Sequence, residues 1–134
     1  MSIQPYLFLN GRCEEAIEFY RRAAGAEVMM LLRFKQAPDQ SMIQPGNEEK
    51  IMHAQLQIGS STVFMSDGMC SGEQKFEGFA LSFTVDNVDE ADRRFKALAE
   101  GGEVRMPLDK TFFSPRFGML ADRFGVGWMI YVEA

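Results

Sequence analysis

The sequence predicts an α+β fold in which two βαβββ modules form a curved mixed β-sheet trough. The first observation is an internal repeat: Glu15-Ala16 matches Glu90-Ala91 at an offset of 75 residues, and Glu27-Val28 matches Glu103-Val104 at an offset of 76. The second is the order of elements, because each half reads as an apolar run, a helix with an acidic start, and a strand that opens with Glu-Val. Solenoid repeats are only about 20 to 50 residues long. The repeat therefore indicates two copies of one supersecondary unit.

The modules are expected at about residues 1–67 and 79–134 of a single domain, joined by a linker at about residues 68–78 that contains three glycines. Apolar alternation predicts strands, and apolar spacing of three and four predicts helices. In the first module we expect a strand at 3–9, a helix at 12–24, and strands at 27–35, 51–58 and 62–67. In the second we expect a strand at 79–85, a helix at 89–100, and strands at 103–108, 117–121 and 128–133.

Composition excludes several classes of function. The chain has 134 residues, of which 46% are hydrophobic and 25% charged, as in ordinary globular domains. Its net charge of −5 and scattered basic residues argue against nucleic acid. No apolar stretch reaches about 18 residues, so no membrane partner is expected. Residues 1–5 lack the basic start of a signal peptide, and Cys13 and Cys70 form no metal or redox motif. A cytoplasmic location is expected.

Four stretches carry a resemblance to a known group of proteins. They are residues 14–20 (EEAIEFY), 53–54 (HA), 65–69 (MSDGM) and 124–130 (FGVGWMI). Together they resemble the vicinal-oxygen-chelate superfamily of glyoxalases, extradiol dioxygenases and bleomycin-resistance proteins. Within it the chain is most similar to the PhnB-like branch, also labelled demethylubiquinone methyltransferase-like. The resemblance spans essentially the whole chain. It implies a glyoxalase/bleomycin-resistance-like fold of paired βαβββ modules and a homodimer, often with strands exchanged between the chains.

The resemblance also implies a divalent metal held by His, Gln or Glu side chains, and this can be checked at each position. The three positions that correspond to the usual ligands are Pro5, Ala80 and Met129. None of these side chains can replace an imidazole or a carboxylate as a ligand. We therefore expect no metal and no other cofactor. An irregular metal site would have to combine His53, the single histidine, with residues whose spacing does not favour it: Gln55, Asp67 or Glu133.

Side-chain alternation on the expected strands identifies the trough wall. The wall is apolar with a few neutral polar groups, which suits a small organic ligand. The candidate ligand-binding residues are His53, Gln55, Gln57, Phe64, Ser66, Ser82, Thr84, Phe112, Met129 and Tyr131.

Several of these residues admit two interpretations. His53 is either a hydrogen-bond donor or general base toward a ligand, or a structural histidine bonded to Gln55 or Tyr131. Trp128 is interpreted as a core residue. The loop that carries Phe112 and its neighbour Phe113 either closes over the trough or covers the other subunit.

The favoured function is a metal-free small-molecule-binding protein that sequesters, senses or carries a hydrophobic or amphipathic ligand. The alternative is a lyase, isomerase or dioxygenase of the same superfamily with an irregular site around His53. A third possibility is an enzyme without a metal that uses His53 as its base. No Gly-x-Ser-x-Gly turn marks a hydrolase, and no glycine-rich strand-to-helix loop offers a site for S-adenosylmethionine.

Overall fold

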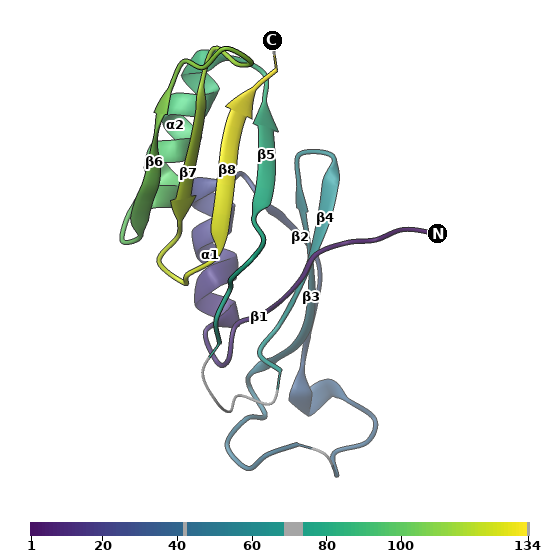
Figure 1. Cartoon of the computed structure of the whole chain (residues 1–134). Coiled ribbons are helices and arrows are strands. Elements are labelled where there is room, and N and C mark those ends of the chain that lie inside the picture. The colour runs from purple at the N-terminus through teal and green to yellow at the C-terminus, as the bar shows by residue number, and fades with distance from the viewer. Residues whose placement is uncertain (42, 69–73, 134) are drawn as a thin grey trace. The chain divides into compact units, whose positions relative to one another are not determined.

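The computed structural model describes residues 1–41, 43–68 and 74–133. The chain forms two compact units, Met1–Gln74 and Lys75–Ala134 (Figure 1). Each contains a four-stranded mixed sheet and an α-helix, in the order strand, α-helix and three strands. The predicted α+β fold of two βαβββ modules is thereby confirmed. Residues 69–73 of the predicted linker, which include Cys70, lie outside the described residues.

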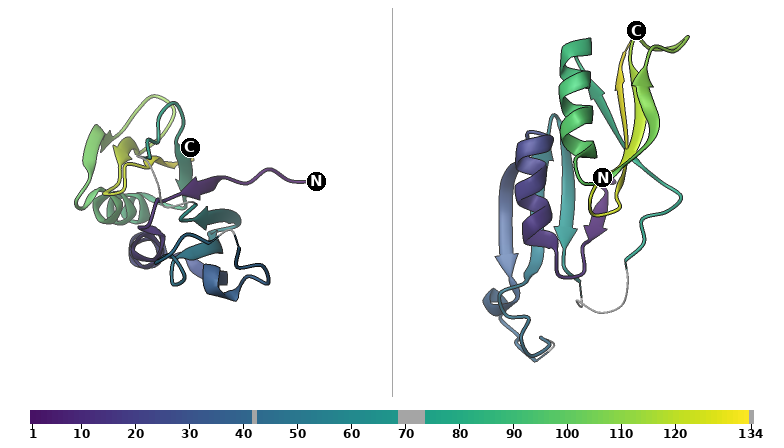
Figure 2. Two further views of the ribbon diagram at one scale, coloured as in Figure 1. Left: turned by 90° about the horizontal axis from the view of Figure 1, so that it is seen from below. Right: turned by 90° about the vertical axis from the view of Figure 1, so that its left-hand side faces the viewer.

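In the first unit the strand order is β1-β4-β3-β2, with β1 parallel to β4 and the other pairs antiparallel. The helix α1 lies against one face of this sheet (Figure 2). The elements are β1 (Tyr6–Phe8), α1 (Cys13–Ala23), β2 (Glu27–Arg33), β3 (Ile51–Ile58) and β4 (Ser61–Ser66).

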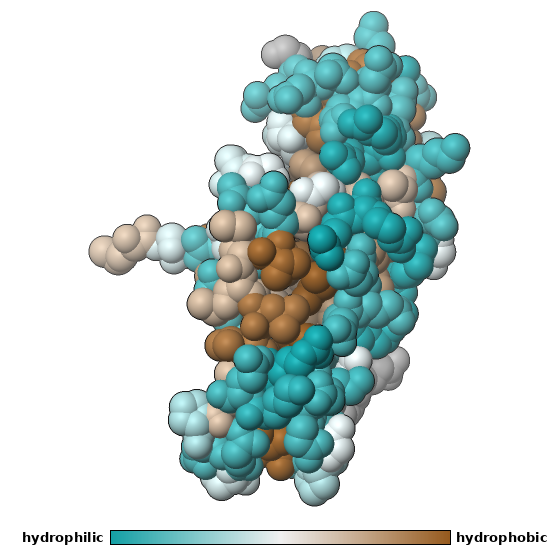
Figure 3. Space-filling view, turned by 180° about the vertical axis from the view of Figure 1, so that it is seen from behind, coloured by the Kyte–Doolittle hydropathy of each residue, from teal (hydrophilic) through white to brown (hydrophobic). Residues whose placement is uncertain are grey.

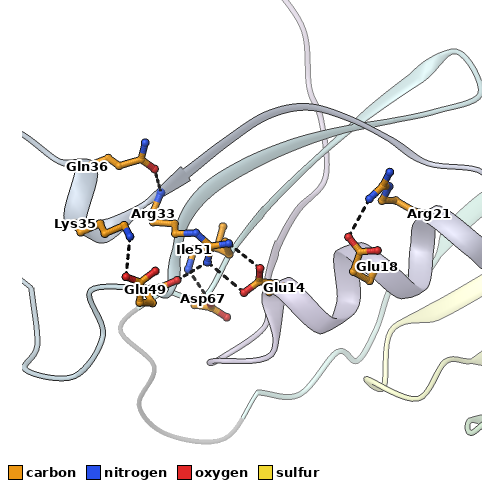
Figure 4. Close-up of polar contacts among 9 residues, drawn as sticks. All are labelled: Glu14, Glu18, Arg21, Arg33, Lys35, Gln36, Glu49, Ile51 and Asp67. Atoms are coloured by element: carbon orange, nitrogen blue, oxygen red, sulfur yellow. Dashed lines mark hydrogen bonds and ion pairs between the residues drawn. The ribbon is translucent and has the colours of Figure 1, made fainter.

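The buried stripe of α1 consists of the residues spaced at three and four, which the sequence predicts to be buried. Ala16, Phe19, Tyr20 and Ala23 are all at most 2% exposed. The start of the helix is held by Asp67, whose carboxylate accepts a hydrogen bond from the backbone N–H of Cys13 at 2.8 Å. It accepts a second from the backbone N–H of Ile51 in β3, also at 2.8 Å (Figure 4). A carboxylate suits the positive end of a helix dipole. Asp67 thus joins α1 to the first residue of β3.

Three expectations about the first unit need correction. The first strand covers Tyr6–Phe8 rather than 3–9, because Pro5 has no N–H and contributes only its carbonyl, which accepts from Phe64 at 2.9 Å. The second strand, β2, ends at Arg33 rather than at the expected residue 35, and the 3₁₀ helix η1 (Phe34–Gln36) follows it. The side chain of Gln36 accepts a hydrogen bond from the Arg33 N–H at 2.7 Å and so turns the chain.

The third correction concerns Met52, which the alternation of β3 assigns to the helix-facing set. Met52 is only half-buried, whereas its neighbour Ile51 is completely buried. The pairing with β2 explains this, since Leu32 pairs with His53 and Arg33 pairs with Ile51. Met52 is therefore skipped as a β-bulge, which shifts the alternation by one residue.

The second unit repeats this arrangement, with strand order β5-β8-β7-β6 and β5 parallel to β8. Its helix lies against one face of the sheet (Figure 2), and the side chain of Asn87 caps it by accepting from the Glu90 N–H at 2.8 Å. The elements are β5 (Leu81–Val85), α2 (Val88–Ala99), β6 (Glu103–Asp109), β7 (Phe117–Ala121) and β8 (Gly127–Val132). The first strand thus begins at Leu81 rather than at the expected residue 79.

Trp128 lies in the core of this unit, as predicted, with 2% of its surface exposed. Its indole N–H donates to the buried carboxylate of Asp122 at 2.9 Å, and Asp122 also accepts from the Val126 N–H at 3.1 Å. These two hydrogen bonds hold the start of β8 against the turn that precedes it. Within the described ranges, neither α1 nor α2 is long and apolar enough to cross a membrane.

Candidate functional site

The open face of the first sheet, opposite α1, carries the polar residues of β3. The helix-facing residues Ala54, Leu56 and Ile58 are buried. The intervening residues point to the other face because side chains alternate along a strand. These are His53, Gln55 and Gln57.

Tyr6 and His53 form the polar centre of this face. The hydroxyl oxygen of Tyr6 lies 2.9 Å from Nδ1 of His53, and Nε2 of Gln55 lies 3.3 Å from Nε2 of the same ring. Each imidazole nitrogen therefore has a hydrogen-bond partner on this face, as donor or as acceptor according to the tautomer of the ring.

Aromatic rings surround this polar centre. Tyr6 stacks on Phe8 with ring centroids 4.9 Å apart, and Phe64 lies 5.8 Å from Tyr6 and 5.4 Å from His53. The register of β1 and β4 places Tyr6 directly beside Phe64. We call Tyr6, Phe8, His53, Gln55 and Phe64 the Tyr6–His53 cluster.

The Tyr6–His53 cluster is open to solvent and contains no Asp, Glu, Lys or Arg. Tyr6 is 41% exposed and Phe8 is 45% exposed. Partial burial raises the pKa of Tyr6 above its ordinary value, against a smaller lowering by a hydrogen bond with Ser66. The phenol is therefore neutral near neutral pH. The cluster presents apolar ring surface with a few hydrogen-bonding groups.

Two further predicted site residues of this unit, Ser66 and Gln57, are held by partners elsewhere in the chain, although Ser66 also hydrogen-bonds with Tyr6. Ser66 is buried, and its hydroxyl accepts from the Gly68 N–H at 2.9 Å. Gln57 is exposed near the β3–β4 turn, where its amide donates to the Gly59 carbonyl at 3.3 Å. Each already has a partner within the chain.

The remaining predicted site residues gather on the second unit. On its sheet the register places Ser82 beside Met129 and Thr84 beside Tyr131. Ser82 and Thr84 are exposed, and Met129 and Tyr131 are half-buried. The predicted residues thus form one group on each sheet, and the hydrogen-bonded group containing histidine belongs to the first.

A series of aromatic rings leads from Tyr131 to the predicted aromatic loop. The ring of Phe117 lies 6.4 Å from that of Tyr131, Phe113 lies 5.0 Å from Phe117, and Phe112 lies 5.2 Å from Phe113. Phe112 is fully exposed.

Hydrogen bonds fix the turn that presents Phe112. Thr111 and Ser114 bond to each other, with the Thr111 N–H donating to the Ser114 carbonyl at 2.9 Å and the Ser114 N–H donating to the Thr111 hydroxyl at 3.1 Å. The Ser114 hydroxyl in turn donates to the Val132 carbonyl at 2.5 Å. The turn is thereby attached to β8.

Sequence reasoning did not select Tyr6. The signal was available, because Tyr6 and Phe8 flank the buried Leu7 and must therefore share the open face of the sheet. The pairing of β1 with β4 could not be read from this alternation, and it is the pairing that places Tyr6 beside Phe64.

The residues at the three positions that correspond to the superfamily's usual ligands do not fit its divalent metal. Pro5, Ala80 and Met129 offer no imidazole or carboxylate. Asp67, one possible partner of His53 in an irregular site, uses both carboxylate oxygens on backbone N–H groups. Over residues 1–41, 43–68 and 74–133, no three His, Cys, Asp or Glu side chains are grouped so that they could hold a metal ion.

The fold is that of the glyoxalase/bleomycin-resistance class. The structure matches a glyoxylase/bleomycin resistance protein/dioxygenase domain from Frankia sp. EAN1pec with a TM-score of 0.67, covering 100% of this chain and 93% of that one. The sequence identity is 13%, so this match speaks for the fold alone.

Within this class the chain belongs to the family described as 3-demethylubiquinone-9 3-methyltransferase, whose family model matches residues 1–131. It is 41% identical to protein PA1353 from Pseudomonas aeruginosa, with a TM-score of 0.88 and coverage of 99% of this chain and 98% of that one. It is 36% identical to protein YjdN of Escherichia coli (strain K12), covering 98% of this chain and 95% of the relative.

A third similar protein carries the name of the expected branch. The putative 3-demethylubiquinone-9 3-methyltransferase, PhnB protein, from Bacillus cereus is 27% identical to this chain, with a TM-score of 0.81 and coverage of 98% of this chain and 99% of that one. The predicted resemblance to the PhnB-like branch is thereby confirmed.

Proposed function

We propose that this chain is a metal-free small-molecule-binding protein whose ligand lies on the Tyr6–His53 cluster. The observation that carries the proposal is the hydrogen bond of 2.9 Å between Tyr6 and His53, set among exposed aromatic rings on the open face of a sheet. Exposed rings next to a few fixed polar groups are the usual composition of a small-molecule site.

The chemistry of the cluster points to a planar, uncharged ligand. Phe8 and Phe64 offer ring surface, and burying apolar area is favourable by about 25 cal/mol per Å². The amide of Gln55 and the hydroxyl of Tyr6 orient polar groups of the ligand. No Asp, Glu, Lys or Arg belongs to the cluster, so nothing in it compensates a ligand charge.

The proposed role is sequestration, sensing or carriage of such a molecule, by a homodimer in the cytoplasm. The side chains at Pro5, Ala80 and Met129 support the metal-free part of the proposal. The second group of predicted residues, with Ser82, Thr84, Phe112, Met129 and Tyr131, belongs to the second unit and is proposed as a further ligand-contacting surface of that unit.

A second candidate function is an enzyme that moves a proton at His53, of the lyase, isomerase or dioxygenase type. The same Tyr6–His53 hydrogen bond favours it, because a phenol beside an imidazole is a pair of groups suited to acid–base catalysis. A reaction that depends on both groups would be lost in His53→Ala and in Tyr6→Phe. Turnover unaffected by both substitutions would exclude this candidate.

Methyl transfer, which the description of the family names, is not part of the proposal. Among the described residues, the connections from a strand to an α-helix are residues 9–12 and 86–87, and neither is the glycine-rich loop that binds nucleotide-like cofactors.

The binding proposal is tested with N-phenyl-1-naphthylamine, an uncharged aromatic probe whose fluorescence rises in apolar surroundings. Titrations compare the wild type with Phe64→Ala and His53→Ala, which alter the cluster, and with Phe79→Ala as a matched control. Phe79 is an exposed aromatic residue of the second unit that packs against Phe76. We expect the affinity to fall about tenfold in the cluster variants, which corresponds to 1.4 kcal/mol.

The control is expected to bind the probe like the wild type. No saturable binding by the wild type, or equal losses in Phe64→Ala and Phe79→Ala, would contradict a specific site at the cluster.

A further inference from the structure

The open face of the second sheet, opposite α2, is laid out in three rows of paired residues. Figure 1 shows this face toward the viewer, with α2 behind the strands. Residues that pair directly across neighbouring antiparallel strands point to the same face. The first row ends in small residues, the second is formed by methionines, and the third contains aromatic rings. The rows are Glu103, Ala121 and Gly127; Met106, Met119, Met129 and Ser82; and Phe117, Tyr131 and Thr84.

Arg105 is an extra residue in the edge strand β6. Val104 pairs with Leu120 and Met106 pairs with Met119, so no residue of β7 stands opposite Arg105. An extra residue of this kind is a β-bulge, which changes the direction of a side chain and is frequent next to functional sites. The bulge therefore accounts for an arginine that does not follow the alternation of its strand.

The guanidinium of Arg105 lies over Gly127 of β8, although β7 separates their two strands. A Cβ atom at Gly127 would stand only 3.6 Å from Nη1 of Arg105. Gly127 is outside the set of glycines with a positive φ, so its backbone does not require glycine. What the glycine provides is space, and a planar group fits there beside the guanidinium.

The positive charge of Arg105 is not compensated on this face. Within the described part of the chain, the guanidinium has no hydrogen bond and no ion pair. This includes Glu103, which lies two positions earlier in the strand. A guanidinium presents its N–H donors as a planar fork that matches the two oxygens of a carboxylate. An anion is therefore the complementary group.

The first unit has the same bulge with a different side chain. At the repeat offset of 76, Met29 corresponds to Arg105, and a register shift between Val28 and Met30 marks the bulge. Met29 is 59% exposed, and Figure 3 shows hydrophobic surface gathered into a patch among polar side chains. One bulge of the repeat thus presents apolar surface, and the other presents a cation.

We propose that the open face of the second unit binds an amphipathic monocarboxylate. The carboxylate accepts N–H bonds from Arg105 above Gly127, and the apolar body lies on the methionine row and extends toward Tyr131. Methionine side chains are flexible and polarisable, so the row adapts to the shape of the body. Four residues of strand separate Gly127 from Tyr131, or about 14 Å, which suits a chain of medium length.

A single carboxylate is favoured because one guanidinium is present and Glu103 would repel a second negative charge. The inference rests on the part of the proposed function that gives the second unit a ligand-contacting surface. It does not depend on the Tyr6–His53 cluster.

The test is a fluorescence titration with 11-(dansylamino)undecanoate, a fatty-acid probe whose dansyl group brightens in apolar surroundings. The uncharged amide of the same compound is titrated in parallel. We expect saturable binding of the carboxylate by the wild type and binding of the amide that is about tenfold weaker, because the amide lacks the charged hydrogen bonds. Added salt should weaken the binding of the carboxylate and leave that of the amide unchanged.

Arg105→Gln removes the charge from the bulge. We expect it to weaken the carboxylate about tenfold and the amide less than about twofold, and to leave the affinity for N-phenyl-1-naphthylamine unchanged. Arg105→Lys keeps the charge without the planar fork and should give an intermediate affinity. Arg93→Gln is the matched control, because Arg93 is an exposed arginine of α2 that pairs with Glu90.

Met106→Ser tests the apolar part of the site at a side chain that is 44% exposed. It should weaken the carboxylate and the amide by the same factor, because both have the same apolar body. Circular dichroism establishes that each variant is folded.

Three results would overturn the proposal: no saturable binding of the carboxylate, equal binding of carboxylate and amide, or equal effects of Arg105→Gln and Arg93→Gln. Loss of carboxylate binding in Phe64→Ala, with Arg105→Gln like the wild type, would place the anion on the Tyr6–His53 cluster and would overturn it too. N-phenyl-1-naphthylamine reports on that cluster separately, so failure of the carboxylate site and failure of the proposed function are distinguishable.

Discussion

The hydroxyl of Tyr6 meets Nδ1 of His53 at 2.9 Å although β1 and β3 are not neighbours in their sheet. The strand β4 lies between them, and neighbouring strands are about 4.8 Å apart. The tyrosine side chain therefore reaches across β4, beside Phe64. The hydrogen bond joins two residues that are 47 positions apart in the chain. A contact of this kind orders the open face without contributing to the buried core.

Replacing Tyr6 by Phe tests the role of this hydrogen bond. The ring and its stacking on Phe8 remain, but Nδ1 of His53 loses its partner. We expect the imidazole ¹⁵N spectrum to change and the probe affinity to fall by less than about tenfold, because a neutral hydrogen bond contributes about 1 kcal/mol. Global stability should change little. An unchanged ¹⁵N spectrum would contradict the hydrogen bond.

Asp67→Asn should strongly destabilise the protein. The carboxylate accepts from the N–H groups of Cys13 and Ile51 in a site that is 1% exposed. The amide of asparagine would direct an NH₂ group toward one of these donors, at a cost of about 3 kcal/mol. Urea unfolding measures the loss. Asp86→Asn, at an exposed carboxylate, is the control and should change the free energy of unfolding by less than about 0.5 kcal/mol.

Glu14 should make a small contribution to the stability at neutral pH, and this contribution should be lost at acid pH. Hydrogen bonding to Arg33 holds the pKa of Glu14 below its ordinary value of 4.5. A lowered folded-state pKa gives stability that is present above the unfolded-state pKa and is lost as the pH falls through the folded-state pKa. Because the side chain is 63% exposed, the contribution is under about 1 kcal/mol.

Unfolding of Glu14→Gln should therefore differ from that of the wild type at neutral pH and converge with it as the pH falls through the lowered folded-state pKa of Glu14. The urea midpoints of the two proteins, followed from neutral to acid pH, provide the check. A difference between the two midpoints that grows as the pH falls would contradict a stabilising ion pair between Glu14 and Arg33.

Gly118→Ala should destabilise the second unit through overpacking. A Cβ atom at this position would lie 2.8 Å from the ring of Phe95 and 2.9 Å from the Cα of Leu108. Crowding of this kind costs about 1 to 3 kcal/mol. Gly127→Ala is the milder comparison, since its Cβ would meet its nearest neighbour at 3.3 Å. Thermal unfolding of both variants measures the difference, and equal effects would contradict the close packing of β7 on β6 and α2.

The alternation of apolar and polar residues was sufficient to predict most of the fold. The strand Ile51–Ile58 has the expected bounds, and the helices start and end within one residue of them. Alternation failed at Met52, because a β-bulge depends on the pairing of two strands and leaves no local signal. The 3₁₀ turn after Arg33 was missed for a similar reason, since it depends on the side chain of Gln36.

The candidate site could be predicted only in part. His53, Gln55 and Phe64 follow from strand periodicity, which assigns each side chain to a face. Tyr6 lies on a short strand whose partner is separated from it by more than fifty residues, so its place beside Phe64 depends on long-range pairing.

The most direct test of the proposed ligand site uses the single histidine of the chain, whose imidazole protons give unique NMR signals. The wild type is titrated with N-phenyl-1-naphthylamine while these signals are followed. We predict that they shift saturably, with the same dissociation constant as the fluorescence titration, and that Phe64→Ala weakens both. Unchanged His53 signals at probe concentrations that saturate the fluorescence would contradict a ligand site at the Tyr6–His53 cluster.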